Sequence, residues 1–165
     1  KDQKVIREKV AEALGHVDLE GQEEKMPESL SGGMRKRVGL ARAIIGEPGC
    51  ILYDEPTTGL DPIVSDSINH LIRRMQKRFS MTSIVVTHDM KTAFHVADQI
   101  AYLHEGRIYF KGNADEFRAS PDPVVQAVAV AATSTIIMMP RYHIACRAMA
   151  PPRGVKCPIP TRSCS

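Results

Sequence analysis

Leu30-Ser31-Gly32-Gly33-Met34 and Ile51-Leu52-Tyr53-Asp54-Glu55-Pro56 are the two segments that decide the fold class of this 165-residue chain. The first indicates the start of a helix, because the Ser31 hydroxyl can accept a hydrogen bond from backbone N–H groups of the first turn. The second is a short apolar run ending in two acids, which is typical of a strand covered on both faces in a parallel sheet.

Helical and strand patterns alternate along the rest of the chain. Apolar spacing, capping residues and glycines predict helices over residues 5–14, 31–45, 61–78 and 90–97, and a short last helix from 113. Apolar or β-branched runs predict strands over 50–53, 83–87, 99–103 and 107–110, the last two joined as a hairpin through Glu105-Gly106. Helices alternating with buried strands predict an α/β layered domain.

The charge divides the chain into two unlike parts. Residues 1–128 hold 17 Lys and Arg against 19 Asp and Glu, whereas residues 129–165 hold five basic residues and no acid. We therefore expect a domain over residues 1–127, with a helical region over 1–46 and the strands over 47–127. Residues 128–165 are predicted to be an atypical basic tail of poor order.

Cysteines and hydropathy bound the cellular setting. Cys50, Cys146, Cys157 and Cys164 lack C-x-x-C spacing, so neither a zinc site nor a redox pair is indicated, and Cys50 is expected to be buried at its strand end. The most apolar run, 124–139, is shorter than the roughly 20 residues of a spanning helix. The chain starts with Lys, and we expect it to begin inside a longer protein.

Ser31, Gly32 and Gly33 are the first candidate site residues. Two glycines at a helix start leave backbone N–H groups uncovered at the positive end of the helix dipole, which makes a possible anion site. An ordinary N-cap explains the same residues without a ligand. The basic triplet at 35–37 opposes the helix dipole unless an acid or anion compensates it, and a solvated run of charge is the simpler interpretation.

Asp54, Glu55 and His88 each follow an apolar strand. The carboxyl edge of an open α/β sheet is where ligands bind, so we expect these side chains to converge there. One carboxylate can hold hydrated Mg²⁺, the adjacent one can orient or deprotonate water, and an imidazole can bind phosphate. The remaining histidines, at 16, 70, 95, 104 and 143, show no metal-ligand grouping in their spacing, so a metal cluster is not expected.

The order of these features strongly resembles the ABC-type ATPase domain over residues 1–126. Residues 30–34 resemble its signature motif, with Met34 where Gln is more usual, and 51–54 resemble its Walker B strand. The resemblance implies that Glu55 is the catalytic glutamate, His88 the switch histidine, and 59–61 the D-loop with Asp61 near nucleotide. Residues 34–43 and 54–62 are most similar to the Mkl/Mla-type ATPases of lipid trafficking.

The resemblance also implies the cofactors and partners. ATP with Mg²⁺ would lie between two ATPase subunits, so that residues 31–33 contact the partner's nucleotide while Asp54, Glu55 and His88 serve the chain's own. The subunit would dock on a membrane permease at the cytoplasmic side of the inner membrane, with no transmembrane segment of its own. The sequence departs from the family in lacking the Walker A loop G-x-x-x-x-G-K-[ST], the adenine-stacking aromatic residue and the Q-loop glutamine.

Because of this departure, we expect a partial P-loop-type domain, made of the helical signature subdomain and the later strands of a mainly parallel sheet. Such a domain should bind ATP very weakly and be inactive alone. Two other classes fit parts of the sequence. A non-catalytic docking module would contact a permease through residues 1–46. An SMC or DNA-repair ATPase also pairs a signature with Walker B, but no heptad run is present, so nucleic-acid binding is not expected.

Overall fold

The computed structural model describes residues 2–131 and 136–139 of the chain. Its helices are α1 (Gln3–His16), η1 (Pro27–Ser29), α2 (Gly32–Ile44), α3 (Pro62–Phe79), α4 (Met90–Val96), α5 (Ala114–Arg118) and α6 (Pro123–Ala131). Its strands are β1 (Cys50–Asp54), β2 (Thr82–Thr87), β3 (Gln99–His104), β4 (Arg107–Gly112) and β5 (Ile136–Met139). The predicted α/β class is confirmed, and so is the hairpin of β3 and β4. The expected mainly parallel sheet is wrong for the described residues, because β1 and β2 pair parallel whereas the other three strand pairs are antiparallel.

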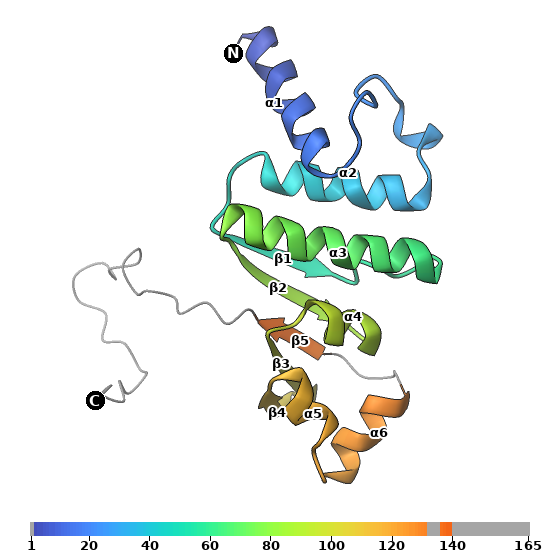
Figure 1. The fold of residues 1–165 in the computed structure, drawn as a ribbon, viewed down its shortest axis with the longest axis vertical. Helices are drawn as coiled ribbons and strands as arrows, with labels where there is room; N and C mark the ends of the chain where they lie inside the picture. The colour runs from blue at the N-terminus through green and yellow to red at the C-terminus, as the bar shows by residue number, and fades with distance from the viewer. Residues whose placement is uncertain (1, 132–135, 140–165) are drawn as a thin grey trace, which may run out of the picture.

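The five strands form one sheet in the order β1-β2-β5-β3-β4. β1 and β2 run parallel, with Cys50 opposite Thr82 and Asp54 opposite Val86. β5 pairs antiparallel with both β2 and β3, so β2 and β3 run in the same direction on either side of it (Figure 1). The carboxyl ends of β1 and β2 therefore meet at one edge of the sheet, as the sequence predicted for Asp54, Glu55 and His88.

The expectation that β1 is covered on both faces is wrong. Ile51 and Tyr53 are buried, but Leu52 between them is 66% exposed. Successive side chains of a strand point to opposite faces, so only one face of β1 is covered within the described residues. Cys50, expected to be buried, is exposed for the same reason.

Local signals set the helix boundaries. Asp61 caps α3 and Pro62 opens it, and Asn113 forms the predicted capping box with Glu116 at α5. In Figure 1, α3 lies alongside β1 and β2 while α2 packs beside α3. One cluster of buried side chains joins these layers, with Ile68, Leu71 and Ile72 of α3 at its centre.

Two segments of the predicted basic tail form secondary structure in the described fold. α6 continues to Ala131, past the boundary expected at 127, and β5 lies between β2 and β3. The apolar run Ile136-Ile137-Met138-Met139 is the sequence signal for this strand. The expected poor order of the remaining tail falls on residues 132–135 and 140–165, which lie outside the described residues.

Within the described parts of the chain, every helix is too short or too polar to cross a bilayer.

Candidate functional site

The start of α2 has the predicted cap. Ser31 has extended backbone angles, and its Oγ accepts a hydrogen bond from the Met34 N–H at 3.2 Å. Gly32 and Gly33 are the first two helical residues, and the first N–H groups of a helix have no intrahelical acceptor. The geometry therefore satisfies both interpretations of Ser31, as an N-cap and as part of an anion site.

The two glycines also have a packing role that the sequence did not indicate. A Cβ on Gly33 would lie 2.7 Å from Val64 Cγ1, and one on Gly32 would lie 3.3 Å from Leu60 Cδ2. The start of α2 therefore sits against the loop before α3 and its first turn, at a distance that a larger residue at 33 does not permit. This contact alone is a sufficient reason for glycine at position 33.

The basic residues after the glycines are bonded to the chain itself. The Arg37 guanidinium donates to Asp18 Oδ2 at 2.6 Å and to Ser67 Oγ at 2.6 Å, and Lys36 Nζ donates to the Glu55 carbonyl at 3.0 Å. The interpretation as a solvated run of charge is wrong for these two residues, since Asp18 supplies the compensating acid for Arg37 and a backbone carbonyl accepts from Lys36. Burial raises the pKa of Asp18, but hydrogen bonds from Arg74 and Arg37 lower that pKa more, and the net pKa lies below its usual value.

Glu55 and His88 meet as predicted, across the ends of β1 and β2. Glu55 Oε1 lies 2.6 Å from His88 Nδ1 and accepts the His88 backbone N–H at 2.9 Å. Its second oxygen, Oε2, accepts the hydroxyls of Thr58 at 2.9 Å and Thr87 at 3.1 Å. Because a carboxylate only accepts, His88 Nδ1 carries the proton in this arrangement. Glu55 is thereby held by four donors.

These donors decide what Glu55 can do chemically. Burial raises the pKa of Glu55, but the His88 side chain, Thr58 and the His88 backbone together lower it below its ordinary value. A carboxylate with a lowered pKa is a weak base, so it orients water better than it removes a proton. The Glu55 backbone has φ of 45°, in the left-handed region that favours glycine, while its N–H bonds the Val86 carbonyl at 2.9 Å.

Asp54 lies beside Glu55 but faces a different environment. It is exposed at the end of β1 and lines an open groove of about 440 Å³ together with Gly32, Lys36 and Gly59. Within the described residues its carboxylate makes no ion pair, so it is available to a cation. Mg²⁺ is usually held by one or two carboxylates plus waters and phosphates, which a single free Asp fits.

Asp61, predicted to lie near nucleotide, is the N-cap of α3. Its Oδ1 accepts the N–H groups of Ile63 and Val64, both at 3.0 Å. The preceding Gly59 has φ of 79°, which glycine adopts without strain. A structural role of Asp61 is therefore visible in the structure, and its contact with nucleotide stays a prediction.

A buried polar network behind the site was missed from the sequence. Thr92 Oγ1 donates to Asp89 Oδ2 at 2.8 Å, receives the Asn69 amide at 3.1 Å, and lies 3.2 Å from Thr57 Oγ1. It joins the loop after β1, helix α3 and the start of α4. The sequence signal was weak, because single Thr and Asn residues are common on helices and in loops.

Two of the remaining histidines lie closer together than their spacing in the sequence indicated. His70 and His95 come together with Asp66, with one potential ligand atom from each within 4.8 Å of the others, and the expectation that no metal is bound there stays a prediction. The sequence shows Asp66 and His70 one helical turn apart, but His95 joins them only through the packing of α4 on α3.

Comparisons with known proteins find a family model and relatives that this chain resembles. Residues 2–58 match the family model described as ABC transporter. The chain is 41% identical to the Protein TRIGALACTOSYLDIACYLGLYCEROL 3, chloroplastic, of Arabidopsis thaliana, covering 75% of this chain and 41% of that one. It is 40% identical to the Fe(3+) ions import ATP-binding protein FbpC of Escherichia coli O157:H7, covering 70% of this chain and 33% of that one.

Solved structures show the same likeness. cbiO1 of Clostridium perfringens, part of the ABC transporter complex cbiONQ, has a TM-score of 0.67 at 33% identity, over 77% of this chain and 51% of that one. A dimer of the ATP-binding cassette MJ0796 with ADP and Pi has a TM-score of 0.59 at 32% identity, over 68% and 49%. The chain thus spans about half or less of the length of these relatives.

Proposed function

We propose, from the premise that this chain is part of an ABC transporter ATP-binding domain, that it carries the signature and hydrolysis residues of that domain. The observation that carries the proposal is the contact of Glu55 with His88 at the ends of two parallel strands. MJ0796, which is solved as a dimer, and cbiO1, which is part of an ABC transporter complex, support a second ATPase subunit and a membrane permease as partners. The subunit would then lie peripherally on the membrane through that permease.

Each site residue has a proposed role that its surroundings support. The N–H groups of Gly32 and Gly33, with Ser31, would bind the phosphates of a nucleotide on the partner subunit. Asp54 would hold Mg²⁺, and Asp61 would position the loop before α3. Glu55 would orient the attacking water, and His88 would bind phosphate through Nε2, since its Nδ1 is engaged by Glu55. Bound ATP and Mg²⁺ would supply the transferable phosphoryl group and neutralise its charge.

Because the 165-residue sequence contains no phosphate-loop motif, the proposal is tested in a chimeric protein. In FbpC of Escherichia coli O157:H7, the region that matches this chain is replaced by the corresponding residues of this chain, and ATP turnover is measured. Turnover is expected, and Glu55→Gln should reduce it about a hundredfold, because the attacking water would lose the carboxylate that orients it. Glu105→Gln is the matched control, since Glu105 also has a left-handed backbone with φ of 48° but lies in the β3–β4 turn.

Two results would count against the proposal. Equal turnover in the Glu55 and Glu105 variants would remove the assigned role of Glu55. Turnover by the 165-residue chain alone, abolished by Glu55→Gln, would contradict the expected inactivity of the chain by itself.

A docking module is the second candidate, and one surface favours it. Val5, Ile6 and Ile45, on α1 and just after α2, are 48%, 45% and 39% exposed and line one surface pocket. An exposed apolar patch marks an interaction site in many soluble proteins. Co-purification with a permease that persists without nucleotide and is lost on Ile6→Asp would favour this function over an active subunit.

The cargo is the least supported part of the proposal. The sequence resemblance favoured lipid trafficking, and one relative bears the name of a galactolipid. Other relatives are named for import of Fe(3+) ions, which favours a different cargo. We keep lipid transport as a hypothesis. Its test is whether phospholipid or Fe³⁺, presented to the assembled transporter, stimulates ATP turnover.

A further inference from the structure

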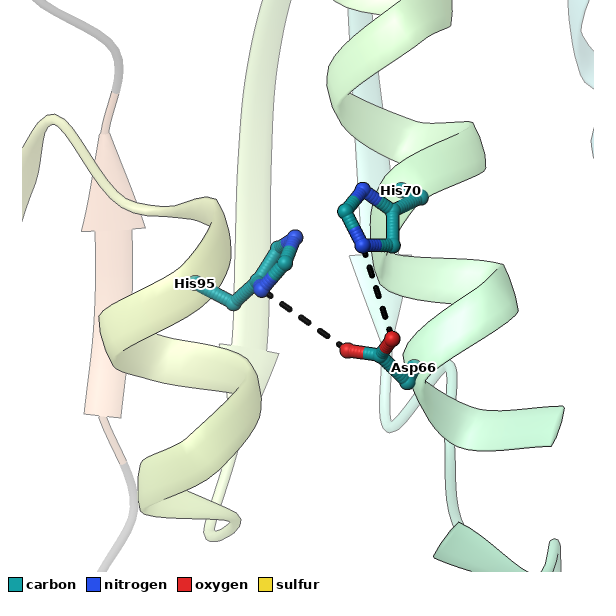
Figure 2. Close-up of side chains that lie close together, drawn as sticks. All are labelled: Asp66, His70 and His95. Atoms are coloured by element: carbon teal, nitrogen blue, oxygen red, sulfur yellow. Dashed lines mark ion pairs between the residues drawn. The ribbon is translucent and has the colours of Figure 1, made fainter. Parts of the chain in front are cut away.

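Asp66, His70 and His95 form a group of potential metal ligands away from Glu55 and His88. Asp66 and His70 lie one turn apart on α3, and His95 lies on α4. One ligand atom from each lies within 4.8 Å of the other two. Figure 2 shows the Asp66 carboxylate between the two rings, with one oxygen toward each imidazole.

The distances are close to those of a metal site. His70 Nε2 lies 3.4 Å from Asp66 Oδ2, and His95 Nδ1 lies 3.8 Å from Asp66 Oδ1. With metal–ligand bonds of about 2.0–2.2 Å, two ligands of a tetrahedral ion are separated by about 3.3–3.5 Å. The His70–Asp66 pair already has this spacing. The two imidazoles lie against different oxygens of Asp66, so one ion would be held by both oxygens, or by one oxygen after a small rotation of the Asp66 side chain. The two rings meet edge to face, 4.4 Å apart, so neither blocks the other.

The helices that carry the ligands are held in place by other contacts. Asn69, next to His70, donates to the buried Thr92 hydroxyl of α4 at 3.1 Å. Arg73 of α3 donates to the Val96 carbonyl at 3.2 Å, next to His95. The separation of α3 and α4 is therefore set by bonds on both sides of the ligand group. Side chains presented from such a rigid pair are preorganised for binding.

The space around the group also suits an ion. Asp66 and His95 line a surface pocket of about 410 Å³ that also contains Asp89 and Lys91, whose opposite charges add no net charge beside the ligands. His70 and Asp66 are largely exposed, and His95 is partly exposed. An ion bound here would keep at least one position open to water or to a further ligand.

We propose that Asp66, His70 and His95 bind one divalent transition-metal ion and so join α3 to α4. Two imidazoles and one carboxylate suit Zn²⁺, Ni²⁺ or Cu²⁺, whereas Mg²⁺ and Ca²⁺ prefer oxygen ligands alone. The site is independent of the proposed ATP chemistry, since it shares no residue with it. It links the helix that follows Asp61 to the helix that follows His88.

The test is a titration of the 165-residue chain with Zn²⁺. Calorimetry measures the binding, and thermal unfolding measures the midpoint with and without Zn²⁺. Because thiolates also bind zinc, all variants are made in a background with the four cysteines changed to serine. We expect one equivalent of Zn²⁺ to bind and to raise the unfolding midpoint, since the ion binds the folded chain. His70→Ala, His95→Ala and Asp66→Asn should each weaken binding at least tenfold. Excess Mg²⁺ should not compete.

Two matched variants serve as controls. His104→Gln removes a histidine of the β3–β4 hairpin, and Asp115→Asn neutralises an exposed acid of α5 that lies outside the group. Both should bind Zn²⁺ like the parent, and circular dichroism checks that every variant is folded. The proposal is overturned if the parent binds no Zn²⁺, if the three ligand variants bind like the controls, or if His88→Gln abolishes binding in their place.

Discussion

Replacing Gly33 by alanine tests whether the start of α2 needs glycine for packing as well as for an anion. Gly33 does not have a positive φ, so alanine introduces no backbone strain there. Its Cβ would lie 2.7 Å from Val64 Cγ1, about 1 Å inside an ordinary carbon contact. Overpacking of this kind costs about 1–3 kcal/mol, and the better helix propensity of alanine returns about 0.5–1 kcal/mol.

The net expectation is that Gly33→Ala lowers the free energy of unfolding by about 0–2.5 kcal/mol. For a chain of this size, each kcal/mol lowers the melting temperature by about 2–4 °C. Gly39→Ala is the matched control in the same helix, because no atom lies within 4 Å of the added Cβ. It should stabilise the chain by about 0.5–1 kcal/mol.

Thermal and urea unfolding of the full chain measure these differences. Val64→Ala removes Cγ1, so the double variant with Gly33→Ala should show a favourable coupling of about 1–2 kcal/mol. If Gly33→Ala is as stable as Gly39→Ala, or if Val64→Ala gives no coupling, the packing argument is refuted. Glycine at 33 would then have to be explained by ligand binding alone.

Three other predictions concern the residues around the site. Thr92→Val should lower the free energy of unfolding, measured in urea, by about 1–3 kcal/mol, because it leaves the buried partners of Thr92 without a hydrogen bond. The control Thr82→Val removes a hydroxyl outside this network and should change the free energy of unfolding by less than about 0.5 kcal/mol. Asp61→Ala should cost about 1 kcal/mol in thermal unfolding through loss of the α3 cap, and Asp61→Asn should retain most of that stability. The pKa of Glu55 is lower in the folded chain than its ordinary value in the unfolded chain, so the ionised carboxylate stabilises the fold above the ordinary pKa. This contribution to stability is lost as the pH falls through the lowered pKa of the folded chain. Urea unfolding across that acidic range should therefore depend less on pH in Glu55→Gln than in the parent, and equal slopes would contradict the assignment.

Local features of the fold were predictable from the sequence. The caps at Ser31, Asp61 and Asn113 depend on residues two or three positions away, and all three have the predicted hydrogen bonds. The meeting of Glu55 and His88 was also predictable, because both follow strands that run parallel in one sheet. These inferences need no knowledge of how distant helices pack.

Contacts between distant segments were not predictable in the same way. Arg37 reaches Asp18 across 19 residues, and His95 reaches Asp66 only because α4 packs against α3. The spacing of residues in the sequence carries no information on either contact. The one-sided cover of β1 was missed because a continuous apolar run does not show which of its faces another element will cover, and Leu52 is exposed.

The position of β5 sets the order in which the sheet can be completed. Within the described residues, β2 and β3 are joined through the four residues of β5, which follow β1 to β4 in the sequence and are therefore synthesised after them. Until then, β2 and β3 each present an unpaired row of N–H and C=O groups, and such edges readily accept a strand from another chain. Between the synthesis of β3 and the pairing of β5, the free edges of β2 and β3 can therefore pair with a strand of another chain. We expect intermolecular pairing of the nascent protein to occur mainly in this interval.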